Sequence, residues 1–215
     1  MNHIIIRHLI SFVLILHCGC VAYYPQMVDI PLIEEKEDFR MDYGMSLMSI
    51  HGTVSYGLTD MIAVQVYGNT NLLTRYDLQG AIGYYKWFEE SLTEMELYCG
   101  YGYGHYRHVG FNSVAEPGDY HSAFTQFNIG KVESGSFDVD FGMGLKSGYM
   151  FSNFVDTDLI ANPKKNGLFF EPTVFFRFWV GNKKSSIKAS YFFPVTIDKR
   201  YSKFIPFNIG ITRQF

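Results

Sequence analysis

The fold of this chain is decided by a stretch in its second half, Phe137-Asp138-Val139-Asp140-Phe141-Gly142-Met143-Gly144-Leu145-Lys146. Every second residue is apolar, and the residues between them are charged or glycine. A period of two is typical of a β-strand, because successive side chains of a strand point to opposite sides of the sheet. The stretch therefore predicts a strand with one apolar and one polar face.

The same alternation recurs from residue 39 to the end of the chain. It predicts strands at residues 39–47, 49–58, 61–69, 76–88, 93–106, 122–133, 136–152, 167–180, 185–197 and 205–215. A tilted strand of about 9–11 residues crosses a bilayer, and most of these segments are long enough. The predicted fold is all-β, an antiparallel up-and-down transmembrane β-barrel of about ten strands, with eight as the alternative count.

Alternation alone does not tell which face is inside. A water-soluble β-sandwich has its apolar face in the core, whereas a membrane barrel turns its apolar face outward. Here the polar faces are rich in glycine, which suits a crowded lumen, and the apolar faces are bulky and aromatic. Short connections such as 58–60 and 181–184 also alternate with longer ones, notably 107–121 and 155–166. These features favour the membrane barrel.

Composition excludes two other classes of protein. Charged residues make up 18% of the chain, aromatic residues 18%, and the formal net charge is −3. Nucleic-acid binding requires a basic surface, which this chain lacks. Intrinsic disorder requires few aromatic and apolar residues, and apolar residues here reach 47%.

The first residues predict an exported lipoprotein. Arg7 precedes an apolar run at 9–16 that is too short to span a membrane as a helix, which is typical of a signal peptide. Gly19-Cys20 at its end resembles the lipobox of bacterial lipoproteins, which implies lipid attachment at Cys20, with Cys18 as the alternative. Cys99 then stays unpaired and is expected to face lipid.

These boundaries predict three parts of the chain: a lipoprotein signal peptide at 1–19, an extended tether at 20–38 and an outer-membrane β-barrel at 39–215. An even number of strands returns both ends of the barrel to the side of the short turns, which is periplasmic in outer-membrane barrels. The lipid anchor at Cys20 is therefore expected on the periplasmic side of the cell outer membrane.

The last eight positions resemble the C-terminal assembly signal of outer-membrane barrels. They contain a polar residue, Asn208, then Gly210, and a terminal aromatic residue, Phe215. The resemblance implies recognition by the outer-membrane assembly machinery.

The polar faces place many charges inside the predicted barrel. The proposed lumen charge network consists of Glu94, Glu96, Asp138, Asp140, Glu171, Lys146, Arg177 and Lys188, together with Arg40 and Asp42. Buried charges are costly unless they are paired. One interpretation is a cation-selective or ligand-guiding lumen. The favoured one is an interior filled by ion pairs, because small barrels are usually filled by side chains.

Histidines are the other candidates for chemistry. His51 is predicted to point inward, and His105, His108 and His121 lie at or near the long connection 107–121. Their spacing matches no metal-ligand signature. No catalytic residue, metal site or cofactor is therefore predicted.

Four further motifs resemble an uncharacterised set of outer-membrane β-barrel lipoproteins of Bacteroidota. The motifs are Tyr24-Pro25 followed by Val28-Asp29-Ile30-Pro31-Leu32-Ile33-Glu34-Glu35-Lys36, the turn Tyr56 to Asp60, the tyrosine- and glycine-rich strand Tyr98 to Tyr106, and Phe170-Glu171-Pro172. The resemblance covers nearly the whole mature chain. It implies a porin-like small barrel in a Gram-negative envelope and no assigned activity.

The sequence thus predicts a non-enzymatic outer-membrane lipoprotein with a structural or interaction role, exerted through the long extracellular loops 107–121 and 155–166. The alternatives are a small-solute or ion channel and, less favoured, an outer-membrane-embedded enzyme that acts on lipid or peptide. The expected partners are outer-membrane lipid, the assembly machinery and an outer-membrane protein, and not nucleic acid.

Overall fold

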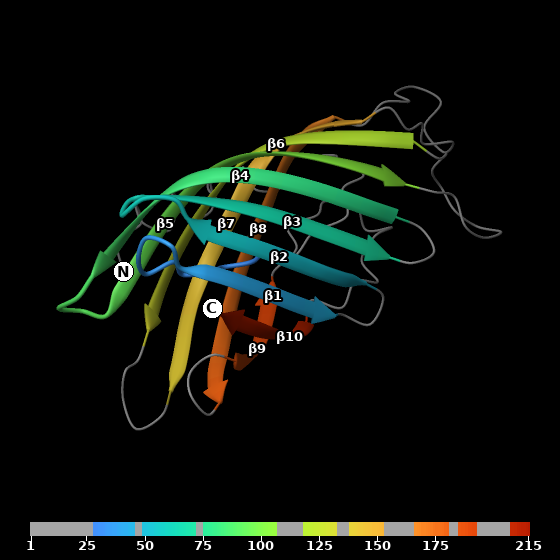
Figure 1. The fold of residues 1–215 in the computed structure, drawn as a ribbon. Coiled ribbons are helices and arrows are strands. Elements are labelled where there is room, and N and C mark those ends of the chain that lie inside the picture. The colour runs from blue at the N-terminus through green and yellow to red at the C-terminus, as the bar shows by residue number, and fades with distance from the viewer. Residues whose placement is uncertain are drawn as a thin grey trace, which may run out of the picture.

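The computed structural model describes residues 28–45, 49–71, 75–106, 118–132, 138–152, 166–180, 185–192 and 207–215. Within them the chain forms a closed barrel of ten strands (Figure 1). The strands are β1 (Phe39–Met45), β2 (Ile50–Gly57), β3 (Ile62–Asn71), β4 (Arg75–Phe88), β5 (Thr93–Tyr106), β6 (Gly118–Val132), β7 (Val139–Ser152), β8 (Gly167–Val180), β9 (Ser185–Phe192) and β10 (Phe207–Gln214). In the same part of the chain, no helix is long and apolar enough to cross a membrane.

Each strand pairs antiparallel with the next one in sequence, and β1 pairs with β10 to close the barrel. In the closing pair Gly44 lies opposite Gly210. The backbone N–H of Phe215 donates to the carbonyl of Phe39 at 3.0 Å, which completes the seam at its end. The prediction of an antiparallel barrel of about ten strands is confirmed.

The turn between β2 and β3 shows why the connections at one end are short. The Leu58 N–H donates to the Ile62 carbonyl at 2.8 Å, and the Thr59 hydroxyl accepts from the Ile62 N–H at 3.0 Å. A threonine side chain that accepts from the backbone a few residues on stabilises a tight turn. The end of the barrel that carries this turn, the connection 89–92, and both the start of β1 and the end of β10 is called the short-turn end below, and the opposite end the long-loop end.

Most predicted strand ends agree with the structure. The strand predicted from residue 136 begins at Val139, and the end predicted at residue 197 lies outside the described residues. Two other differences are instructive. Strands β3 and β4 extend into the predicted loop between Thr70 and Arg75, because their pairing continues to Asn71 opposite Arg75. The predicted loop 107–121 is also too long. Strand β6 begins at Gly118, so His121 is a strand residue paired with Tyr103.

The apolar faces point outward, as predicted for a membrane barrel. On β7, for example, Phe141, Met143 and Leu145 expose 43–58% of their surface, while Asp140 and Lys146 are buried. Cys99 is exposed on the outward face of β5, also as predicted. A water-soluble sandwich would bury the opposite set of residues, so this alternative is excluded by the geometry.

Aromatic side chains gather toward both ends of the outward face. At the short-turn end the rings of Phe39 and Phe215 lie 5.5 Å apart. Toward the long-loop end Tyr76, Tyr101 and Tyr103 are exposed on β4 and β5. Such a distribution is typical of the interfacial girdles of outer-membrane barrels.

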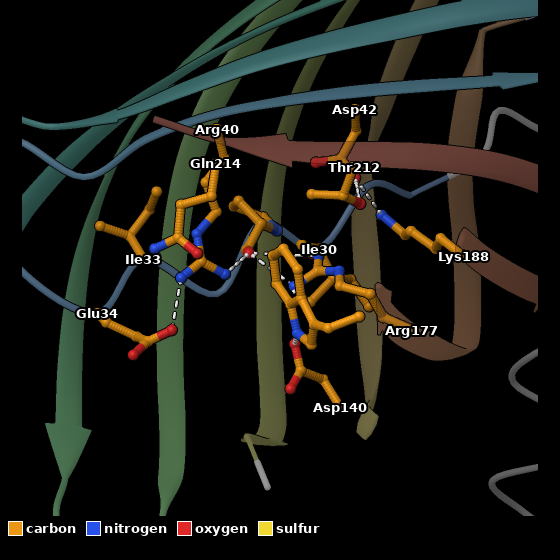
Figure 2. Close-up of polar contacts among 12 residues, drawn as sticks. Ile30, Ile33, Glu34, Arg40, Asp42, Asp140, Arg177, Lys188, Thr212 and Gln214 are labelled. Atoms are coloured by element: carbon orange, nitrogen blue, oxygen red, sulfur yellow. Dashed lines mark hydrogen bonds and ion pairs between the residues drawn. The ribbon is translucent and has the colours of Figure 1, made fainter. Parts of the chain in front are cut away.

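The segment before β1 does not behave as the predicted tether. Val28, Ile30, Leu32 and Ile33 are 0–1% exposed and pack against residues that point into the lumen. Residues 28–34, which we call the lumen segment, thus occupy the barrel interior (Figure 2). The prediction was wrong here because an extended run with prolines resembles a linker in sequence. Its apolar side chains nevertheless stabilise the fold when they are removed from water.

Candidate functional site

The barrel interior is the candidate site, because it gathers almost all charges that the sequence assigned to the lumen. The members that are buried at 0–4% exposure are Arg40, Asp42, Glu94, Glu96, Asp140, Lys146, Glu171, Arg177 and Lys188. Asp138 is the exception. It directly precedes β7 and is only half-buried, while its carbonyl accepts from the Trp179 N–H at 2.8 Å.

Arg40 binds the end of the lumen segment nearest to β1. Its guanidinium donates to Asp38 at 2.9 Å, to Glu34 at 2.6 Å and to the Pro31 carbonyl at 2.8 Å. Figure 2 shows the dashed contact from Arg40 to Glu34. A buried guanidinium needs several acceptors in its own plane, and here the lumen segment supplies two of the three.

Arg177 binds the lumen segment from strand β8, which is separated from β1 by β9 and β10. It donates to the carbonyl of Ile30 at 2.8 Å and to that of Pro31 at 3.3 Å, and it pairs with Asp140 at 3.3 Å. The indole N–H of Trp179 donates to the same carboxylate at 2.7 Å. Two arginines from strands that do not pair with each other therefore converge on one short stretch of backbone.

Asp29 is the only acidic side chain in the lumen segment that faces Lys188. The Lys188 ammonium contacts Asp29. It also lies 3.4 Å from Asp42, to which the Thr212 hydroxyl donates (Figure 2). The Asp29 carbonyl accepts from two glutamine side chains, Gln126 at 2.7 Å and Gln65 at 3.4 Å. Strands on several sides of the barrel thus bind one residue.

Glu96 fixes the backbone of the lumen segment at Ile33. Its carboxylate accepts from the Ile33 N–H at 3.0 Å, from the Asn128 amide at 2.7 Å and from the Tyr98 hydroxyl at 3.2 Å. Its neighbour Glu94 is fully buried, and both of its carboxylate oxygens lack a hydrogen-bond partner among the described residues. Of these two neighbouring glutamates, only Glu96 is hydrogen-bonded to the lumen segment.

Glycines on the inward faces make room for the apolar side chains of the lumen segment. A Cβ atom at Gly130 would lie 2.7 Å from a methyl group of Leu32, and one at Gly144 would lie 2.8 Å from Ile30 and from Asn128. The backbone of Leu32 is in the left-handed region, with φ of 57°. A non-glycine residue keeps this costly conformation only where its surroundings hold it, so the fit of Leu32 against Gly130 is specific.

We expect Gly144→Ala to lower the free energy of unfolding by about 1–3 kcal/mol, because the added methyl group overpacks the contact with Ile30. The matched control is Gly80→Ala on the outward face, where a Cβ would meet nothing within 4 Å. Urea titration in detergent micelles, with folded protein scored as the band of altered mobility in unboiled SDS gels, measures both. Equal effects of the two substitutions would contradict the proposed contact.

Around Lys146, farther along the lumen toward the long-loop end, side chains fill most of the described space. Lys146 contacts Gln79, lies 3.9 Å from Glu171 and sits 4.2 Å from the ring centre of Phe124. A cavity of about 10 Å³ remains beside Lys146. This is room for one water molecule. The arrangement favours the interpretation that ion pairs and hydrogen bonds fill the interior.

The histidines fall into two places. His51 is buried in the lumen, as predicted, and its ring stacks on that of Tyr67. His105 and His121 instead lie on the outward face. There His105 and Tyr103 contact Asp119 at 2.8 and 2.7 Å, and Tyr101 contacts His121 at 2.7 Å. Within the described ranges, no group of histidine, cysteine and acidic side chains could hold a metal ion.

Several predicted features lie outside the described residues. They are the signal peptide 1–19, the lipid attachment at Cys20 with its alternative Cys18, His108, and most of the loops predicted at 107–121 and 155–166. The proposed assembly-signal residues are described: Asn208 is buried beside His51, Gly210 lies opposite Gly44, and Phe215 is exposed at the short-turn end.

The main part of the site that sequence reasoning missed is the lumen segment with its partners Gln65 and Gln126, together with Asn128, which donates to Glu96. One signal was present. Val28, Ile30 and Leu32 alternate with Asp29 and Pro31, which is the same period of two that identified the strands. No protein-family model matches this chain, and no curated protein matches it.

Proposed function

We propose that this protein is an outer-membrane β-barrel lipoprotein, anchored through Cys20, with a non-enzymatic structural or interaction role. Its long connections, 107–117 between β5 and β6 and 153–166 between β7 and β8, are the surfaces that engage a partner, which we expect to be another envelope protein. This is also the class of Bacteroidota lipoproteins that the sequence resembles.

The outward face supports the membrane part of the proposal. Residues such as Val66, Ile82, Leu97 and Ile187 expose 51–56% of their surface around the barrel wall. So much exposed apolar surface is unfavourable in water, whereas it is what hydrocarbon chains accept. The aromatic residues toward both ends suit the two boundaries of a bilayer.

The observation that carries the functional part is the occupied lumen. The chain's own residues 28–34 fill the space between Arg40, Glu96 and Arg177, and the described lumen beside Lys146 has room for about one water molecule. Because the protein's own N-terminal segment contacts the inward side chains of the barrel, little of the interior surface is accessible to a solute. Its connections at the long-loop end are therefore the better candidates for function.

The channel alternative is tested by conductance. We expect the purified protein to give no discrete current steps in planar bilayers, because the lumen segment blocks the path. Deletion of residues 28–33 is the positive control. It should produce steps, since removal of the segment empties the space between Arg40 and Arg177. Discrete steps from the unaltered protein would favour the channel over the interaction role.

A further inference from the structure

The outward face of the barrel is hollowed where β5, β6 and β7 run side by side. Small side chains meet there near the middle of the strands: Cys99 lies opposite Thr125, and Thr125 lies opposite Ser147. The space has a volume of about 550 Å³, and the residues that line it include Cys99, Ala123, Thr125, Ser147, Leu168 and Phe170. We call it the wall hollow. Ligand pockets of proteins commonly measure about 300–1,000 Å³, so the wall hollow is large enough to hold part of a ligand.

The wall hollow suits an apolar chain. On its side toward the short-turn end lie Leu97, Phe127 and Leu145, which expose 39–51% of their surface and stand higher than the small residues. Inside it, the hydroxyls of Thr125 and Ser147 lie 3.3 Å apart and hydrogen-bond to each other. A hydrocarbon chain placed over this pair therefore leaves neither hydroxyl without a partner.

Polar side chains continue the same face toward the long-loop end. His121 lies two positions before Ala123 on β6, and Asp119 lies two positions before His121. Both contact side chains of the neighbouring strand β5. We call the group the polar cluster, and its members are Tyr101, Tyr103, His105, Asp119 and His121.

Hydrogen bonding leaves the polar cluster rich in acceptors. The Asp119 carboxylate accepts from the Tyr103 hydroxyl at 2.7 Å and from His105 Nδ1 at 2.8 Å. A neutral imidazole carries only one N–H, so Nε2 of His105 is then an acceptor as well. The side chains of His105 and Asp119 are 28% and 43% exposed, respectively. A ligand that bonds to this part of the polar cluster has to supply donors.

The charge of the polar cluster is complementary to a cation. Its five residues include no lysine or arginine, and imidazole is mostly neutral at neutral pH, so the carboxylate of Asp119 supplies the formal charge. Tyr101 and Tyr103 expose 55% and 38% of their surface beside it. An ammonium group has three donors, pairs with a carboxylate and is attracted to the faces of tyrosine rings. The polar cluster therefore fits an ammonium group.

We infer that this face binds one phospholipid with an ethanolamine headgroup, with its ammonium at Asp119 and an acyl chain in the wall hollow. Ala123 lies four residues from Asp119, roughly 13–14 Å along the strand, so the two ends of one lipid molecule reach both places. The inference rests on the proposed function and deepens it, because a bilayer around the barrel brings lipid to this face.

Native mass spectrometry of the purified full chain in detergent tests the inference. The protein is titrated with dioleoyl phosphatidylethanolamine and, separately, with dioleoyl phosphatidylglycerol, which has the same acyl chains but no ammonium. Asp119→Asn removes the charge, and Ala123→Leu fills the wall hollow. Ala189→Leu, on the outward face of β9, is the matched control for Ala123→Leu. The mobility of unboiled protein in SDS gels shows whether each variant is folded.

We expect the apparent Kd of the one-lipid adduct to be about fivefold lower for phosphatidylethanolamine than for phosphatidylglycerol. Asp119→Asn should abolish this preference. Ala123→Leu should raise the apparent Kd for phosphatidylethanolamine about fivefold, whereas Ala189→Leu should leave it unchanged.

Three results overturn the inference: equal binding of the two lipids, a preference that survives Asp119→Asn, or equal effects of the two leucine substitutions. A dimer in the same spectra that Ala123→Leu dissociates also overturns it, because the wall hollow then holds a second copy of the chain. Failure of the proposed function gives a different result. Protein that stays monodisperse without detergent and does not float with lipid vesicles contradicts the membrane location itself.

Discussion

Replacement of Arg177 by alanine is expected to lower the free energy of unfolding by about 3–5 kcal/mol. The substitution leaves the carboxylate of Asp140 buried without its cationic partner, and it removes the donors to the carbonyls of Ile30 and Pro31. Breaking one side of a buried ion pair costs this much because the remaining charge is left uncompensated. The urea midpoint of the folded band in detergent micelles measures the loss.

Lys86→Ala is the control for Arg177→Ala, since Lys86 is a cation on strand β4 with an exposed side chain. Its removal should change the free energy of unfolding by less than about 0.5 kcal/mol. The Arg177→Ala, Asp140→Ala double variant should lose less than the sum of the two single losses, because each removes the other's partner. Strict additivity would contradict the pairing, as would a loss from Arg177→Ala no larger than that of the control.

Replacement of Phe141 by arginine is expected to cost about 2–4 kcal/mol of folding free energy in lipid vesicles. Phe141 lies on the outward face of β7 and exposes 43% of its surface, so a bilayer around the barrel would surround the new guanidinium with hydrocarbon. The measurement is the urea dependence of folding into vesicles, again followed by the mobility of unboiled protein.

Phe141→Leu separates the charge from the loss of the aromatic ring. It should cost less than about 1.5 kcal/mol, as expected for an apolar replacement of similar size. An arginine that is tolerated as well as leucine would mean that Phe141 faces water, and the membrane location would then fail even though the barrel fold stands.

The alternation of apolar and polar residues with a period of two was sufficient to predict the strands, because a barrel wall has two chemically different faces along its whole length. The strand β5, for example, places Glu94 and Glu96 inward and Leu97 and Tyr101 outward, and its predicted bounds agree with the structure. The ends were less predictable where strands pair beyond the alternating pattern. Gly118 and Asp119 extend β6 because Tyr106 and His105 are available opposite them.

The lumen segment was not predictable as part of the barrel because its contacts depend on register. Arg40 and Arg177 belong to strands β1 and β8, which do not pair with one another, and they meet at the Pro31 carbonyl only when the barrel is closed. The sequence identifies both as inward charges. It does not tell that their acceptors are backbone carbonyls of residues 30 and 31.

The short distance in sequence between the lumen segment and β1 makes it difficult for another molecule to displace the lumen segment from the barrel interior. Residues 35–38 are all that connects Glu34 to the barrel wall at Phe39. A short linker holds its ligand at an effective concentration in the millimolar range. A separate peptide or solute that binds the same arginines would have to exceed that concentration to take its place, so the interior is reserved for its own chain unless the connection is cut.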